Sequence, residues 1–151
     1  MTTFQIILVV VVALAAIAYL IHSIRSGEKK QAARRALQAE LRAEWEDGPY
    51  QRDYNIAGIN KYGLTMADCG LARGWVMRDK ENRHDKNAVA VFRNETHVGY
   101  LNREIAKEFA PKLDEIGKAV PCLLSIRSEV DEGDGHQYFV GRVRILWPVT
   151  E

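Results

Sequence analysis

The chain has 151 residues, and its 21 Lys and Arg residues against 20 Asp and Glu residues give a formal net charge of +1. This length holds one domain and an appendage. The balanced charge excludes a global electrostatic attraction to nucleic acid or to an anionic membrane.

The first segment, residues 4–24, is apolar and carries no charge. At about 1.5 Å per helical residue it crosses about 30 Å of hydrocarbon. A cleaved signal peptide is the alternative, but no Lys or Arg precedes the apolar run, and the run is longer than a typical signal core. We expect a single transmembrane helix over 4–24.

Basic residues crowd the C-terminal flank of this segment: Arg25, Lys29, Lys30, Arg34 and Arg35. Because basic flanks stay in the cytoplasm, the expected topology is single-pass, with the N-terminus out and the C-terminal domain cytoplasmic. In the cytoplasm, Cys69 and Cys122 are expected to remain reduced thiols.

Residues 25–48 form an expected charged helical linker, rich in strong helix formers and ended by Gly48 and Pro49. An apolar stripe recurs every four residues within it, at Ala33, Leu37, Leu41 and Trp45. The stripe is either a short homodimer seam through residues 28–47 or a face lying on the domain or on lipid.

Beyond the linker, short apolar runs alternate with turn residues. We expect strands over 54–59, 71–78, 88–92, 97–101 and 120–127, with a last strand over 137–147 that runs to Pro148. A helix is expected over 103–116, in two pieces or kinked at Pro111. The fold class is mostly β with one helical crossover, a small partly open barrel over residues 50–148.

The cysteines, Cys69 and Cys122, are too few for a disulfide framework or a metal site. We expect Cys122 to be a small buried hydrophobe. His97 and His136 are expected at the surface. No G-x-S-x-G elbow, P-loop or H-E-x-x-H occurs, so we expect neither catalysis nor a cofactor.

The most informative stretch is residues 81–104, in which a polar loop precedes a hairpin and then a helix start capped by Asn102. It contains N-R-H-D-K-N-A-V-A-V from Asn82 and V-G-Y-L-N-R-E-I-A from Val98. These two blocks, in this order, resemble the signature of the HIRAN domain. The resemblance extends from Tyr54 to Trp147.

In the HIRAN family, an OB-like barrel recognises single-stranded DNA, particularly a free 3′-hydroxyl end. The resemblance makes Asp85 the acceptor for that hydroxyl and Arg103 a phosphate contact, and it gives Tyr100 a stacking or donating role. A carboxylate only accepts, which suits a hydroxyl better than a phosphate. The implied nucleic-acid-binding set is Lys61, Tyr62, His84, Asp85, Lys86, Tyr100 and Arg103. Asp85 and Asn87 have a structural reading as well, because Asx residues cap turns.

Three features depart from the family pattern. His84 stands where DNA-binding members have Tyr, and Asn60-Lys61 stands where they have Arg-Tyr, which shifts that platform to Tyr62. The hairpin over residues 129–134 is acidic. The alternative function is therefore a membrane-anchored protein-interaction module that keeps the barrel without binding DNA.

Overall fold

The computed structural model describes residues 2–49 and 52–147. The chain forms two compact units, Met1–Ala39 and Glu40–Glu151, and each is described by itself. The first unit consists of helix α1 (Thr3–Asp47), whose last turns belong to the second unit. One stretch of α1 is long and apolar enough to cross a membrane, and none of it is buried. Residues 50 and 148, the limits of the expected domain, lie outside the described residues.

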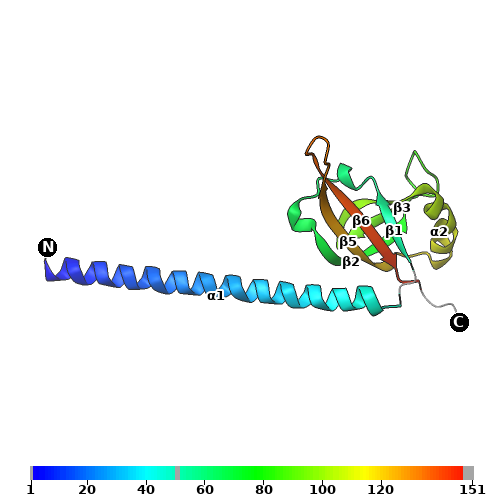
Figure 1. The fold of residues 1–151 in the computed structure, drawn as a ribbon. Coiled ribbons are helices and arrows are strands. Elements are labelled where there is room, and N and C mark those ends of the chain that lie inside the picture. The colour runs from blue at the N-terminus through cyan, green and yellow to red at the C-terminus, as the bar shows by residue number, and fades with distance from the viewer. Residues whose placement is uncertain (1, 50–51, 148–151) are drawn as a thin grey trace. The chain divides into compact units, whose positions relative to one another are not determined.

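The second unit contains six antiparallel strands in a closed barrel of order β1-β4-β3-β2-β5-β6. The expected mostly-β fold is confirmed, and each expected strand is present. The strands are β1 (Asp53–Ala57), β2 (Gly70–Arg78), β3 (Val89–Arg93), β4 (Thr96–Leu101), β5 (Val120–Val130) and β6 (Gln137–Ile145), and Figure 1 labels all of them except β4.

The barrel is closed, where a partly open one was expected, because the short strand β1 pairs on both sides. Ile56 pairs with Leu101 of β4, and Tyr54 pairs with Val143 of β6. Gly99 permits the first pairing, since a Cβ there would stand 2.6 Å from the carbonyl oxygen of Ala57. Its φ of +151° also favours glycine.

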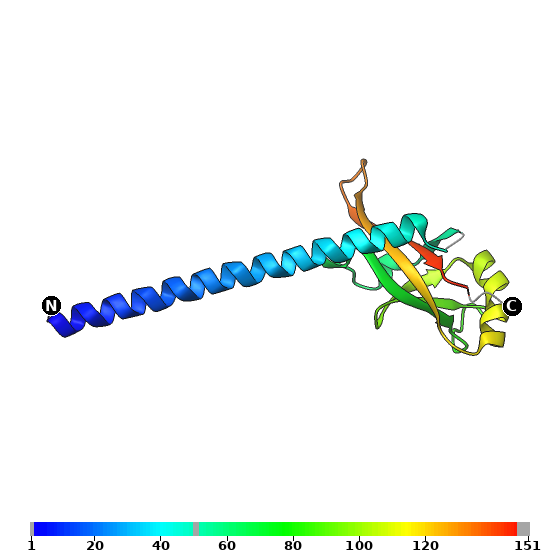
Figure 2. The same cartoon turned by 90° about the horizontal axis from the view of Figure 1, so that it is seen from below.

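Helix α2 (Arg103–Ile116) covers one end of the barrel, and the tip of the β5–β6 hairpin projects at the far side (Figures 1 and 2). Asn102 caps it by accepting the amide of Ile105 at 2.9 Å, as expected. The helix is one element through Pro111, so the expected division into two pieces is wrong. Proline removes one backbone hydrogen bond from the helix, and the packing of the buried helix face offsets this loss. The buried residues of that face are Ala106, Phe109, Ala110 and Leu113.

Aliphatic side chains from all six strands and α2 fill the barrel. Cys122 is among them, and burial raises the pKa of its thiol to about 12. The expected small buried hydrophobe is therefore confirmed.

The last two turns of α1 pack within this second unit. Leu41 is 2% exposed, and the Trp45 ring lies under the Arg144 guanidinium at 4.3 Å. Glu40 and Glu44 pair with Arg73 of β2 at 2.9 and 2.8 Å. The C-terminal half of the apolar stripe therefore lies on the domain, which is one of the two readings that the sequence left open.

Candidate nucleic-acid interface

A β-bulge in β4 places two rings on the same outer face of the barrel. Phe92 of β3 pairs with His97, but Val91 pairs with Gly99, so Val98 is an extra residue in β4. In regular alternation residues 97 and 100 would point to opposite faces. The bulge brings both outward, while Val98 stays fully buried. His97, expected at the surface, is instead half-buried.

His97 is the centre of a ring cluster that we define as Tyr62, Phe92, His97 and Tyr100. The Phe92 ring stacks on His97 with centroids 4.9 Å apart, and the Tyr100 ring makes a T-shaped contact with His97 with centroids 4.8 Å apart. Tyr62, just after the 3₁₀ turn Ile59–Lys61, lies 4.5 Å from the same imidazole. Three separate segments thus supply one aromatic surface.

A hydrogen-bond network links the ring cluster to the polar loop. The Tyr100 hydroxyl donates to Asp79 Oδ2 at 2.8 Å, and the Asn82 amide donates to the same oxygen at 3.4 Å. Asn82 Oδ1 then accepts the backbone amides of His84 and Asp85, at 2.9 and 3.1 Å. The position of the loop is therefore tied to the position of the Tyr100 ring.

This network shifts the pKa values of Asp79 and Tyr100. The hydrogen bond from Tyr100, with help from Asn82, lowers the pKa of Asp79. Burial and the bond to Asp79 raise the pKa of Tyr100 to about 12. At neutral pH Asp79 is therefore an anion and Tyr100 is a neutral donor.

Asp85 is held in its own turn while it faces a cation. Its Oδ1 accepts the amide of Asn87 at 2.8 Å, the Asx turn that the sequence analysis offered as the structural reading. Its Oδ2 lies 3.8 Å from Nε of Arg103, whose side chain is 77% exposed. Asp85 and Arg103, two members of the expected site, are thus brought together.

The remaining expected residues are exposed at the edges of this region. Lys61 ends the 3₁₀ turn next to Tyr62, and His84 and Lys86 flank Asp85 in the loop. The backbone of Lys86 is anchored, because its carbonyl oxygen accepts Arg78 Nη2 at 3.0 Å. Their side chains are solvated and free to meet a ligand.

Asn60, where the family has a basic residue, has a structural partner instead. Its side-chain amide donates to the carbonyl of Phe139 at 3.0 Å and accepts the Phe139 amide at 2.7 Å. It therefore fastens the 3₁₀ turn to β6. Tyr62 supplies a ring on this side, 4.5 Å from His97.

A hollow of about 250 Å³ lies beside the ring cluster. Phe92, His97 and Tyr100 form its aromatic wall, and Arg78 and Asp79 form its polar edge, with Met77 and Ala90 also lining it. Asp85 does not line this hollow, so the expected hydroxyl acceptor and the aromatic wall are adjacent parts joined through Asn82.

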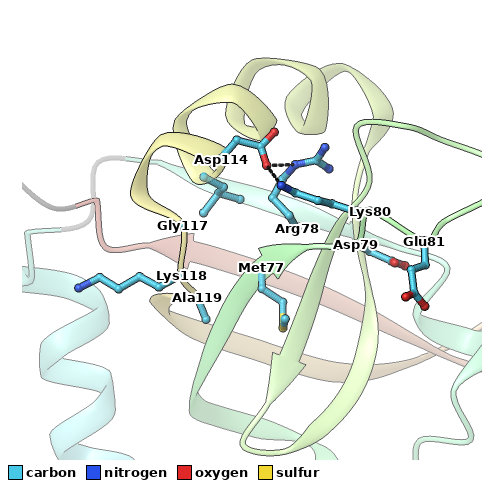
Figure 3. Close-up of a pocket in the computed structure, with 10 residues that line it drawn as sticks. Met77, Arg78, Asp79, Lys80, Glu81, Asp114, Gly117, Lys118 and Ala119 are labelled. Atoms are coloured by element: carbon cyan, nitrogen blue, oxygen red, sulfur yellow. Dashed lines mark hydrogen bonds and ion pairs between the residues drawn. The ribbon is translucent and has the colours of Figure 1, made fainter.

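A larger hollow of about 440 Å³ lies between the end of β2 and the end of α2 (Figure 3). Asp114 holds both Arg78 and Lys80 there, at 3.2 and 3.1 Å. The lining has three basic and three acidic side chains and no aromatic ring. Without a net charge or a stacking surface, it is the weaker candidate for nucleic acid.

Residues 72–130 match the family model of the HIRAN domain. This part of the barrel is therefore similar to the HIRAN domain. The match begins in β2 and ends with β5, so it includes the polar loop, the hairpin β3–β4 and α2.

Among solved structures, the crystal structure of the HIRAN domain of human HLTF is similar, with 19% sequence identity and a TM-score of 0.43. The similarity covers 62% of this chain and 74% of that chain. No curated protein matches the sequence.

Sequence reasoning missed three residues of the candidate interface: Asp79, Phe92 and His97. Asp79 ends a strand and looks like an ordinary turn residue. The bulge that turns His97 outward has no clear sequence signal except Gly99, two residues later. A positive-φ glycine inside a strand was the available indication.

Proposed function

We propose that this chain is a membrane-tethered HIRAN module that binds single-stranded DNA at its 3′ end on the cytoplasmic side. The observation that carries the proposal is the union of the ring cluster with the Asp85–Arg103 pair through the Tyr100–Asp79–Asn82 network. HIRAN domains are in general nucleic-acid-binding modules, which supports the same reading.

The chemistry suits the end of a single strand. Unpaired bases stack on aromatic rings at about 1–3 kcal/mol each. Asp85 Oδ2 accepts a terminal hydroxyl, and the neighbouring Arg103 contacts the last phosphate. Lys61 and Lys86 are exposed on either side for further phosphates. Base pairs inside a duplex present no free ring faces to such a site.

The tether is the apolar stretch of α1. The basic residues after it favour a cytoplasmic position for the barrel, and anionic head groups would attract them with about 1 kcal/mol per Lys or Arg near the surface. Since Leu41 and Trp45 pack on the domain, a homodimer through residues 28–47 would use Ala33 and Leu37.

A protein-interaction module is the second candidate, and the β5–β6 tip favours it. Asp131, Glu132 and Asp134 are all exposed there, and such an anionic tip repels phosphates. An acidic loop of this kind suits a basic protein partner.

The test is fluorescence anisotropy with the full chain in lipid nanodiscs. We expect binding of a single strand but not of the same sequence as a blunt duplex, and about tenfold weaker binding by Tyr100→Ala. Tyr138→Ala, which removes a ring at the β5–β6 hairpin, is the matched control. An absence of single-strand binding at low salt would contradict the proposal and leave the protein-interaction module as the remaining candidate function.

A further inference from the structure

The outer face of β2 carries a large exposed ring that the HIRAN signature does not include. Trp75 is 48% exposed and Met77 is 42% exposed, although β2 is paired along both edges. Both point outward, since the buried residues of β2 alternate with them. Exposed apolar side chains grouped in this way mark contact surfaces.

Trp75 continues the ring cluster across the sheet. It pairs directly with Phe92 of β3, and Phe92 stacks on His97 of β4. A row of rings therefore runs over three adjacent strands, from Trp75 to Tyr100. Two strand spacings measure about 10 Å, which is the height of about three stacked bases at about 3.4 Å each.

We propose that Trp75 is a further base-stacking residue, which binds bases 5′ of those held at the ring cluster. The inference rests on the proposed function and gives the strand a direction across the barrel, from Tyr100 over β3 to β2. The occupant is single-stranded nucleic acid, since the Trp75 surface is continuous with the candidate interface and is built from side chains that stack.

Charge plays little part at this end of the row. The nearest cations along the two strands are already paired, Arg73 with Glu40 and Glu44, and Arg93 with Asp68 at 3.5 Å. Trp75 therefore contributes through stacking and not through counterion release. Its loss lowers the affinity without changing the dependence of affinity on salt.

The test measures the affinity of the full chain in nanodiscs for oligonucleotides of about two and about eight nucleotides, both ending in a 3′-hydroxyl. Trp75→Leu keeps an apolar side chain and removes the ring. We expect about tenfold weaker binding of the longer strand, an unchanged salt slope, and unchanged binding of the shorter one. Trp75→Phe keeps a ring and should restore most of the affinity.

Val130→Ala is the control, because Val130 is also exposed, to 60%, but lies at the end of β5. If the wild type binds the longer strand and Trp75→Leu binds it equally well, the inference is wrong and the proposed function stands. Loss of self-association in Trp75→Leu with unchanged DNA affinity would likewise overturn it. If the wild type binds neither strand, the proposed function itself fails.

Discussion

The hydroxyl of Tyr100 donates to the Asp79 carboxylate at 2.8 Å, and this bond ties a ring of the outer sheet face to the loop that carries Asp85. Tyr100 lies in β4, and Asp79 directly follows the last residue of β2. Their contact makes the aromatic wall and the polar loop one preorganised surface. A nucleic acid that binds this surface would therefore lose little free energy to the ordering of either part.

Tyr100→Phe separates the two roles of this side chain. It removes the hydrogen bond to Asp79 but keeps the ring, so we expect unfolding free energy to fall by about 1 kcal/mol. DNA affinity should fall less than in Tyr100→Ala. Urea denaturation and anisotropy measure the two effects.

Tyr138→Phe is the control for that substitution, since Tyr138 donates to Glu129 at 2.9 Å in the same kind of bond. It should leave DNA affinity unchanged. Equal losses of affinity in Tyr100→Phe and Tyr100→Ala would mean that the hydroxyl, and not the ring, makes the contact.

The Asp79 carboxylate also predicts a pH dependence. Its pKa is lowered in the folded state, so its contribution to stability is present above the ordinary value of about 3.9 and is lost as the pH falls through the lower folded value. We expect Asp79→Asn to flatten the loss of stability below about pH 4. Denaturation at a series of pH values measures this. A variant that loses stability as steeply as the wild type over that range would refute the assignment.

Gly99→Ala tests the closure of the barrel. The new methyl group would stand 2.6 Å from both the Ala57 carbonyl oxygen and Ile56 Cγ2, at a φ of +151°. We expect a loss of about 2 kcal/mol or more in unfolding free energy, because the β1–β4 pairing must shift. In Gly133→Ala the nearest atom is a movable carboxylate oxygen of Asp131 at 3.1 Å, so this control should change stability little. Similar stabilities for the two variants would contradict the close approach of β1 to Gly99.

The salt dependence of binding reports how many phosphates the protein contacts. With Lys61, Lys86 and Arg103 as the cations, the logarithm of the affinity should fall with the logarithm of salt at a slope of about −2. Arg103→Gln should reduce the slope by about 0.7. Lys107→Gln, an exposed position on the same helix, should leave it unchanged. A slope that Arg103→Gln does not alter would remove Arg103 from the interface.

Much of the fold was predictable because local patterns agree with it. The strands follow short apolar runs between turn residues, and the Asn102 cap and Gly117 end define α2. The partner strands of β1 were not predictable, since pairing depends on residues far apart in the chain. The division of the helix at Pro111 was wrongly expected, because the packing of Phe109 and Leu113 outweighs a local preference.

The candidate site was predictable where it lies in one continuous segment. The loop and Asp85 follow from the motif, and so does the cap that places Arg103 opposite Asp85. His97 and Phe92 were not predictable, since a bulge and a cross-strand pair bring them together. Asn60 was named as a departure from the family pattern, but the sequence did not reveal its backbone partner Phe139, 79 residues away.

The most direct measurement compares the affinity for two single strands of the same sequence, one with a 3′-hydroxyl and one with a 3′-phosphate. We predict that the full chain in nanodiscs binds the hydroxyl strand at least tenfold more tightly, by about 1.5–3 kcal/mol, because Asp85 accepts the hydroxyl and repels the phosphate. Asp85→Asn should abolish this preference and retain the ring cluster. Equal affinities of the wild type for the two strands would contradict the account.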